Sequence, residues 1–445
     1  VTAVEEIVAS VFAEVLGVDR VGLDDDFFEL GGNSLNATRT IKRIADALDT
    51  ELSVRVLFEA STVQDLAAHA ESRTGSGGRV ALTAVERPER IPLSLAQQRM
   101  WFLNRFDGSA AAYNIPMALR LQGDLDVSAL SAAISDVIGR HESLRTVYPE
   151  IGDGPVQVVK PVSSWSDEIV AEPTGVDELE GELVALASTR FDVTREIPIR
   201  IRLFQLASDE YVLGVAIHHI SADGSSMAPF ARDVVTAYAS RVAGYTPSWA
   251  PLDVQYADYS LWQREVLGSE EDAGSIASQQ IAYWSNALAG LPDQLALPAD
   301  RPRPATQSFR GGYLHFDIDA ELHARLSGLA RANNSTLFML THTAFAMLLA
   351  RLSGTEDIAV GTPIAGRGER ALDDLIGMFV NTLVFRTQID SGAPFLDLLG
   401  RVRETDLQAF AHSDVPFERL VEVLNPPRST ARHPLYQVGF LFQNM

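Results

Sequence analysis

The chain has 445 residues, of which 46% are hydrophobic and 21% are charged, a balance typical of a folded protein with more than one domain. Its 36 basic and 59 acidic residues give a net charge of −23, which argues against nucleic acid as a partner. The absence of cysteine excludes disulfides, thiolate metal sites and cysteine nucleophiles.

Other broad classes are also disfavoured. No stretch of about 18 consecutive apolar residues and no basic-then-apolar leader is present, so we expect no membrane as partner and place the chain in the cytoplasm. No His, Asp and Glu set has metal-ligand spacing, so we expect no metal. Because the first residue is Val1 rather than Met, we expect the chain to be part of a longer protein.

Residues 1–73 are predicted to form a small all-α domain. The stretch "VEEIVASVFAEVLGV" places Val4, Ile7, Val8, Val11, Phe12 and Val15 on one stripe at helical spacing. A loop of acids, aromatics and glycines follows, "DDDFFELGGNSL", and then two further helical stretches, "SLNATRTIKRIADAL" and "LSVRVLFEASTVQDLAAHA". Residues 74–90 have the Gly/Ser-rich and then charged composition of a linker.

Residues 91–445 are predicted to be mixed α/β and to form two lobes, 91–270 and 271–445. Strands are expected in "AYNIPMALRLQG", "IPIRIRLFQLA", "YVLGVAIHHI" and "GYLHFDID". Helices are expected in "ELHARLSGLARANN" and "STLFMLTHTAFAMLLARLSG". A proline-rich stretch, "LALPADRPRPATQSFRGG", lies near residue 300 and separates the lobes.

Ser34 is the first candidate site residue. Its local pattern allows a plain role, because Ser is a preferred helix N-cap and Gly31 and Gly32 permit a tight turn before it. The run Leu30-Gly31-Gly32-Asn33-Ser34-Leu35, however, resembles the phosphopantetheine attachment motif of peptidyl carrier (thiolation) domains. The resemblance covers residues 1–73 and implies a four-helix carrier whose Ser34 holds a covalent 4'-phosphopantetheine.

His218 and His219 are the second candidate, at the end of the near-continuous apolar run "YVLGVAIHHI". Such a run predicts a buried strand, on which adjacent side chains point to opposite faces. Asp223 and Gly224 follow, a carboxylate that needs a partner when buried and a residue that permits a turn.

"HHISADG" resembles the His-His-X-X-X-Asp-Gly signature of nonribosomal peptide synthetase condensation domains, which have two chloramphenicol-acetyltransferase-like lobes. Six further stretches match that family in order: "SLAQQRMWFL", "RHESLRTVY", "YADYSLW", "IGMFVNTLVFR", "HSDVPFE" and "RSTARHPL". Family members continue beyond the last motif, so we expect the second lobe to be incomplete at its end.

The resemblance implies a role for each residue of the signature. It assigns His219 to the reaction centre and leaves His218 to support the strand, while Asp223 holds the loop by a salt bridge and Gly224 keeps the substrate channel open. Arg140 and Arg145 of "RHESLRTVY" are both candidate partners of Asp223, and the sequence does not choose between them.

Three further residues concern the channel. Ser225 stands where the family usually has an aromatic residue, which would alter the channel wall. Asn381 and Thr382 belong to a motif that the family places beside the channel, although they would equally suit the edge of a strand.

The function implied is amide-bond formation between a donor thioester on the chain's own carrier and the amine of an amino acid on a downstream carrier. Adjacent adenylation domains and a phosphopantetheinyl transferase would be further partners. Whether His219 acts as a general base or as a positioning group stays open, because an α-amine with a pKa near ~8 loses its proton at little cost. Two alternatives remain: an epimerisation domain, which shares the His-His motif, and a non-catalytic module that docks partners to a carrier. Cues to the donor's stereochemistry conflict.

Overall fold

The computed structural model describes residues 2–71, 77, 80–106, 110–165, 168–308, 310–427 and 429–442. The expected boundary between residues 73 and 74 and part of the expected linker lie outside these residues, as does Arg428 of "RSTARHPL". The described chain forms two compact units, and each is considered by itself: Val1–Ala81 with Val266–Arg370 and Asn381–Met445, and Leu82–Glu265 with Ala371–Val380.

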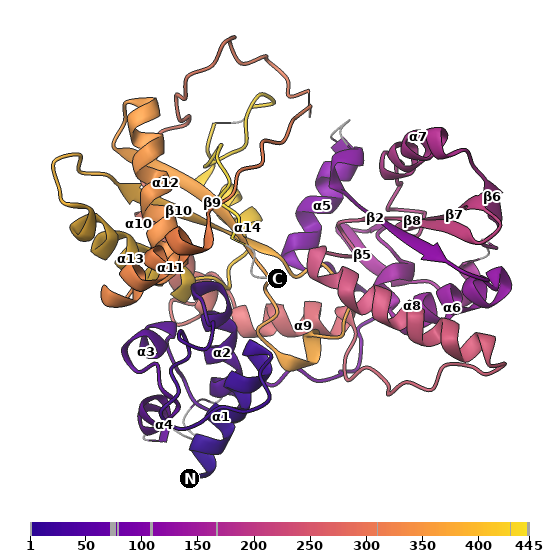
Figure 1. The fold of residues 1–445 in the computed structure, drawn as a ribbon, viewed down its shortest axis with the longest axis horizontal. Coiled ribbons are helices and arrows are strands. Elements are labelled where there is room, and N and C mark those ends of the chain that lie inside the picture. Colours follow the sequence, from indigo (N-terminus) through magenta and orange to yellow (C-terminus); the bar gives the residue numbers. More distant parts are fainter. Residues whose placement is uncertain are drawn as a thin grey trace. The chain divides into compact units, whose positions relative to one another are not determined.

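The first 71 residues are helical, as expected. The four helices are α1 (Ala3–Leu16), α2 (Ser34–Ala47), α3 (Val54–Glu59) and α4 (Val63–Glu71), drawn in indigo in Figure 1. Thr2 and Glu5 form a capping box at the start of α1, and Gly17 ends the helix with a φ of 68°. The core is made by buried apolar side chains of the helices and the loop before α2: Val8, Phe12, Phe27, Ile44, Leu57 and Leu66.

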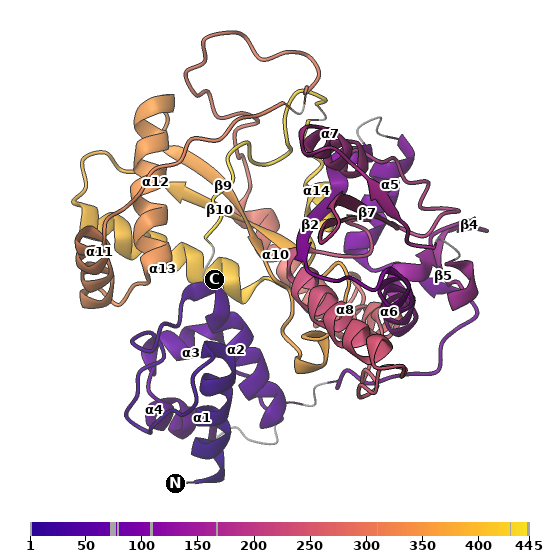
Figure 2. The ribbon, with the colours of Figure 1, turned by 45° about the vertical axis from the view of Figure 1, so that its right-hand side comes forward.

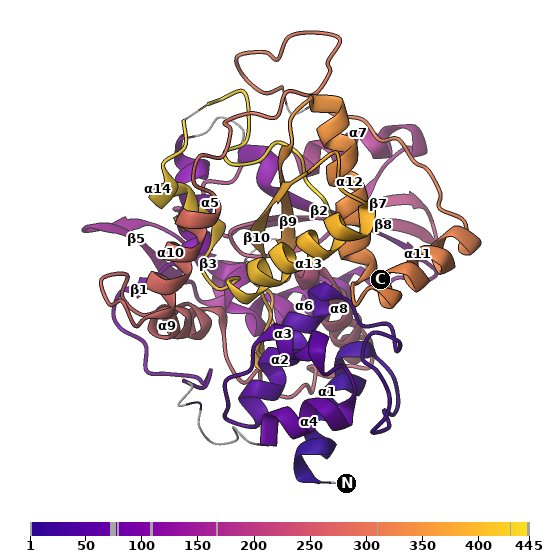
Figure 3. The same cartoon turned by 90° about the vertical axis from the view of Figure 1, so that its left-hand side faces the viewer.

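The same unit contains a two-stranded antiparallel sheet of β9 (Asp357–Ile364) and β10 (Asn381–Gln388). Helix α12 packs on β9 and α13 on β10, an arrangement that Figure 3 shows from the side. The helices of this part are α10 (Ile276–Ala287), α11 (Ala320–Ala332), α12 (Leu337–Ser353), α13 (Phe395–Ala411) and α14 (Phe417–Leu424).

The second unit is built on a four-stranded sheet in the order β2-β8-β7-β6. Its strands are β2 (Asn114–Gln122), β6 (Ala171–Pro173), β7 (Ile199–Ala207) and β8 (Glu210–His218), and only the β6–β7 pair is parallel. A smaller sheet joins β1 (Ile91–Pro92), β3 (Thr146–Val147), β4 (Glu150–Ile151) and β5 (Gly154–Val159).

Strand β8 is buried because helices cover both of its faces. Leu213, Val215 and Ile217 share a core with α6 (Val127–Arg140) and α8 (Met227–Val242), two helices that run side by side in Figure 2. On the other face α7 (Val176–Ala187) approaches so closely that a Cβ at Gly214 would lie 2.7 Å from Leu186. The remaining helices of the unit are α5 (Leu95–Phe106) and α9 (Tyr256–Leu267), with short 3-10 turns at Ala110–Tyr113, Glu142–Arg145, Val162–Ser164 and Gly224–Ser226; a further turn is Arg370–Leu372.

Two expectations about this region need correction. "GYLHFDID" forms no strand: Tyr313, Leu314 and Phe316 are 96%, 91% and 81% exposed, and no strand among the described residues pairs with the segment. The expected division at residue 270 also differs from the contacts, because Ala371–Val380 belongs to the second unit. Its apolar residues Leu372, Leu375, Met378 and Phe379 complete a core there with α5 and α9.

Candidate functional site

His219 follows β8 directly and is anchored through its backbone and one ring nitrogen. Its backbone N–H donates to the Tyr113 carbonyl at 2.8 Å, and its Nδ1 lies 2.9 Å from Sδ of Met378. The side chain is half-buried, and in the described part of the chain its Nε2 has no hydrogen-bond partner. His219 therefore presents a ring nitrogen that is free to meet a substrate.

His218 has a different environment, although it is the next residue. It is 1% exposed, its Nδ1 accepts the backbone N–H of Ile220 at 3.1 Å, and its ring packs edge-on against Phe191. Burial lowers the pKa of His218 to about 4, with a smaller contribution from the neighbouring His219. The ring is neutral at pH 7 and suits the structural role expected for it.

Asp223 is fully buried and serves as the acceptor that organises the following turn. Its Oδ1 accepts the backbone N–H of Ser226 at 2.9 Å and the Ser226 hydroxyl at 2.8 Å. Its Oδ2 accepts the backbone N–H of Phe379 at 3.0 Å. The carboxylate thus ties the histidine loop to the segment Ala371–Val380 within the same unit.

The expectation that Arg140 or Arg145 pairs with Asp223 is wrong. Arg140 donates from Nε to Asp233 at 3.0 Å and to the Ala250 carbonyl at 2.7 Å. Arg145 donates to the carbonyls of Lys160 and Gly139. The motif instead closes a charged cluster at the end of α6, where His141 also reaches Asp233 at 2.8 Å.

The two residues after Asp223 are both exposed. Gly224 opens a 3-10 turn without a positive φ, and an added Cβ there would meet nothing within 4 Å, so the turn does not require glycine. Ser225 is exposed beside it. Their expected places along a substrate channel stay predictions.

Ser226, Gly377 and Tyr256 are contacts that the sequence reasoning missed. The Ser226 hydroxyl donates to the Gly377 carbonyl at 3.0 Å and accepts the Gly377 N–H at 3.1 Å, while the Tyr256 hydroxyl donates to the Met378 carbonyl at 2.6 Å. The only signal was that "YADYSLW" and "IGMFVNTLVFR" both matched family motifs, which does not reveal that they meet.

Asn381 lies in the first unit at the start of β10 and has a bracing role. Its Nδ2 donates to the carbonyls of Ser413 and Val415 at 2.9 and 3.0 Å, and its Oδ1 accepts the N–H of Phe417 at 2.9 Å. Asn381 therefore fixes the "HSDVPFE" motif against the strand. Thr382 is half-buried beside it and donates its backbone N–H to the Asn381 side chain at 2.8 Å.

Ser34 is the first residue of α2, but it is not the N-cap that its local pattern allowed. Asn33 is the N-cap, and its side chain accepts the backbone N–H groups of Leu35 and Asn36. The preceding glycines are required, since Gly31 has a φ of 102° and a Cβ at Gly32 would lie 2.5 Å from the Phe27 carbonyl oxygen.

The Ser34 hydroxyl is fully buried in the first unit. It lies 2.5 Å from the hydroxyl of Thr336, the N-cap of α12. Ion pairs lie near this contact, Lys42 with Asp414 and Arg55 with Glu404. A group attached to Ser34 therefore requires Thr336 to separate from it.

The position of Ser34 nevertheless fits a phosphate ester. A hydroxyl on the first residue of a 14-residue helix lies at the positive end of the helix dipole, where a phosphate anion is favoured. The residues present are thus compatible with a phosphopantetheine on Ser34 once the hydroxyl is exposed.

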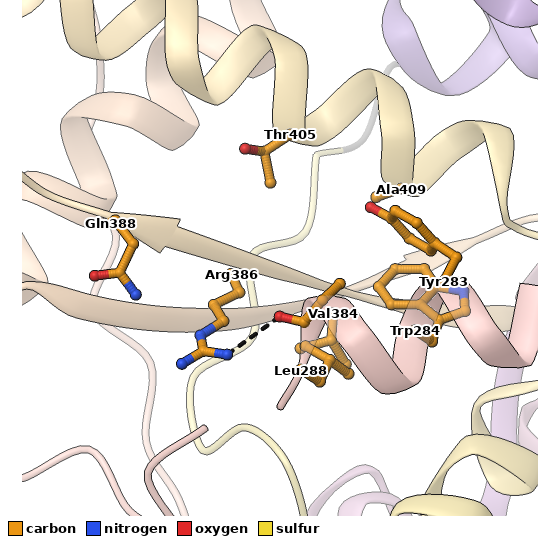
Figure 4. Close-up of a pocket in the computed structure, with 9 residues that line it drawn as sticks. Tyr283, Trp284, Leu288, Val384, Arg386, Gln388, Thr405 and Ala409 are labelled. Atoms are coloured by element: carbon orange, nitrogen blue, oxygen red, sulfur yellow. Dashed lines mark hydrogen bonds between the residues drawn. The ribbon is translucent and has the colours of Figure 1, made fainter. Parts of the chain in front are cut away.

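A cavity of about 400 Å³ lies between α10, β10 and α13 in the first unit, as Figure 4 shows. Its polar groups are already engaged: Arg386 pairs with Asp357 and donates to the carbonyls of Ala287 and Ala289, and Tyr283 stacks on His412 with ring centroids 3.8 Å apart. The cavity offers no reactive group and is not the candidate site.

Among the described residues, no single helix has the length and apolar character needed to cross a membrane. The bent pair α11 and α12, at 102° to each other, meets the length and composition test only when taken together.

Comparisons with known proteins match the whole chain. A family model for the phosphopantetheine attachment site covers residues 6–70, and one for the condensation domain covers residues 88–445. The chain is 51% identical over 443 residues to the probable non-canonical nonribosomal peptide synthetase CymA of Salinispora arenicola, and 49% identical over 443 residues to a dimodular nonribosomal peptide synthase of Bacillus subtilis. All of this chain is covered, but it spans only 6% and 18% of the length of these curated relatives.

Among solved structures, the chain is similar to the X-domain in its complex with OxyB from teicoplanin biosynthesis, with a TM-score of 0.76 and 40% identity. The match covers 82% of this chain and 80% of that chain. The expected carrier followed by a two-lobed α/β condensation fold is confirmed.

Proposed function

The chain belongs to the nonribosomal peptide synthetases, as a phosphopantetheine attachment domain followed by a condensation domain, and we propose that it joins two carrier-bound acyl units through an amide bond. The observation that supports this most directly is the environment of His219, whose Nδ1 is anchored and whose Nε2 is free of partners among the described residues.

We infer that Ser34 is the attachment residue. When bound there, 4'-phosphopantetheine supplies a thiol, in a chain that has no cysteine of its own, to hold an aminoacyl or peptidyl group as a thioester. The residues around Ser34 contribute the helix terminus that favours the phosphate and the glycine turn that carries the serine to it.

In the reaction, the acceptor's amine nitrogen bonds to the donor's carbonyl carbon and the carbon–sulfur bond breaks, releasing the thiol. Nε2 of His219 is the atom that takes the proton the amine loses, or that holds the amine in place by accepting its N–H. With an α-amine pKa of about 8, deprotonation at pH 7 costs only roughly 1.4 kcal/mol, so positioning and stabilisation of the developing charge carry much of the effect.

The partners of such a reaction are other parts of a synthetase. We propose a downstream carrier bearing the acceptor amino acid, adenylation domains that load both carriers, and a phosphopantetheinyl transferase that modifies Ser34. The printed names of the relatives include multi-subunit systems such as linear gramicidin synthase, which is consistent with such an arrangement.

The experiment loads Ser34 enzymatically with an aminoacyl phosphopantetheine, adds a second carrier bearing an amino acid, and follows both by intact-protein mass spectrometry. We expect the donor mass to move to the second carrier, and His219→Gln to slow the transfer by about 10²–10⁴-fold if His219 is a general base. A loss of less than about tenfold would assign it to positioning instead.

His323→Gln is the matched control, because His323 is exposed on α11 in the other unit and should leave the rate unchanged. Inversion of the donor's stereochemistry on Ser34, without transfer, would replace condensation by epimerisation.

A docking role is the second candidate, favoured by one observation: the X-domain to which this chain is 40% identical was solved in complex with OxyB. If this chain serves only to dock a partner, no transfer occurs with any donor and acceptor pair, while purified OxyB, used as the probe, binds the chain with measurable affinity. Transfer that depends on His219 would exclude docking as the sole function.

A further inference from the structure

Met378 lies against the reaction-centre histidine, with its Sδ 2.9 Å from Nδ1 of His219. A thioether sulfur has lone pairs but no proton, so in a hydrogen bond it can only accept. The contact is a hydrogen bond only when Nδ1 carries the proton of the neutral ring. We propose that Met378 is a positioning residue that holds His219 in its Nδ1–H form and so keeps Nε2 as the proton acceptor.

The backbone around Met378 is fixed on three sides, which is what places the sulfur. Gly377 exchanges two hydrogen bonds with the Ser226 hydroxyl, the Met378 carbonyl accepts from Tyr256, and the N–H of Phe379 donates to Asp223. The approach is too close for a side chain at position 377, since a Cβ there would lie 2.2 Å from Cδ2 of Tyr256. Asp223 and Ser226 of the histidine loop thus determine where the thioether lies.

The neighbouring histidine shows that the loop assigns protons to particular ring nitrogens. Nδ1 of His218 receives a backbone N–H from Ile220, so the neutral His218 ring carries its proton on Nε2. His219 has the reverse arrangement, with Nδ1 facing an acceptor-only sulfur. The two adjacent rings are therefore held in opposite tautomers.

This inference rests on the proposed function, because a fixed tautomer matters only if Nε2 of His219 meets the acceptor's amine. A neutral imidazole with its proton on Nε2 has no lone pair to offer there. Holding the proton on Nδ1 removes that unproductive form before substrate arrives, which is a form of preorganisation.

The test is nitrogen NMR of the whole chain carrying ¹⁵N-labelled histidine, recorded at a pH where the rings are neutral. The His219 signals are identified by their loss in His219→Gln. In the wild type we expect Nδ1 to give the signal of a protonated nitrogen and Nε2 that of an unprotonated one. In Met378→Leu, which conserves side-chain volume, the Nδ1–H form should fall from the predominant to a minor population.

Met100→Leu is the matched control, since Met100 is 6% exposed, as Met378 is, and belongs to the same hydrophobic cluster. It should leave the His219 tautomer unchanged. Predominant Nε2–H in the wild type, or an unchanged tautomer in Met378→Leu, would overturn the proposal. The spectra require no transfer activity, so an absence of amide formation with an intact Nδ1–H signal would refute the proposed function and not this inference.

Discussion

Ser34 and His219, the two residues on which the proposed reaction depends, lie in opposite kinds of surroundings. Ser34 is fully buried and its hydroxyl contacts Thr336, whereas His219 is half-buried and keeps Nε2 without a partner among the described residues. The difference matches what each residue has to do. A carrier serine must be released to be modified and to deliver its cargo, while a reaction-centre histidine must stay in place.

The interactions around the two residues differ in strength accordingly. The ion pairs near Ser34, such as Arg55 with Glu404, are partly exposed, and pairs of this kind contribute about 0–1 kcal/mol. The loop that carries His219 depends on buried hydrogen bonds of Asp223, where one donor left unsatisfied costs about 1–3 kcal/mol. The contrast predicts a readily broken contact at Ser34 and a robust one at His219.

The largest effect is expected from Asp223→Ala, which removes the acceptor of two buried backbone N–H groups, those of Ser226 and Phe379. We expect the free energy of unfolding to fall by roughly 3 kcal/mol, measured by urea denaturation. Ser225→Ala, an exposed change in the same loop, should stay within about 0.5 kcal/mol of the wild type. Similar values for both variants would show that Asp223 does not stabilise the loop.

The next effect concerns pH and His218. Because its folded-state pKa is about 4 and the ordinary value is 6.5, the unfolded chain binds a proton in this window that the folded chain does not. Stability therefore falls as pH is lowered from 7 to 4, by up to about 3 kcal/mol from this group.

His218→Asn removes the titration while keeping an acceptor for the Ile220 N–H, so its stability should depend less steeply on pH than that of the wild type. His323→Asn, at an exposed position, should keep the wild-type slope. Urea midpoints measured across this range give the comparison, and parallel curves for all three proteins would contradict the assignment to His218.

The smallest effect is expected at Ser34. Glu404→Arg repels Arg55 and should expose the Ser34 hydroxyl more often, so that a phosphopantetheinyl transferase modifies it up to about fivefold faster. Intact-protein mass spectrometry follows the modification. Adding Arg55→Glu should restore the slower rate.

Glu422→Arg is a matched charge reversal, because Glu422 pairs with Arg419 on the same helix and not with α1–α4. It should leave the rate of modification unchanged. An equal rate in Glu404→Arg and the wild type would mean that the contact does not limit access to Ser34.

The fold was largely accessible from the sequence, because helical stripes and apolar runs are local signals. The helices of residues 1–71 and the strands β2, β7 and β8 follow from their periodicity. "GYLHFDID" misled because its alternation is that of a strand, while strand formation also depends on a neighbour with which to pair.

The site was accessible in its residue types but not in its partners. The histidine motif indicated the reaction centre, yet Arg140 was assigned to Asp223 because a buried carboxylate usually takes a cation. In the structure Asp223 accepts backbone N–H groups from Ser226 and Phe379. No local pattern predicts a hydrogen bond between a side chain and a backbone group 156 residues away.

The segment Ala371–Val380 has a consequence for biosynthesis. The unit that holds His219 is otherwise made by Leu82–Glu265, so its core stays incomplete until a segment about a hundred residues later has left the ribosome. At roughly 5–20 residues per second, the places later filled by Leu375 and Phe379 stay open for about 5–20 s. During that interval the nascent chain exposes apolar surface to chaperones and to other nascent chains, and Met378 reaches His219 only near the end of synthesis.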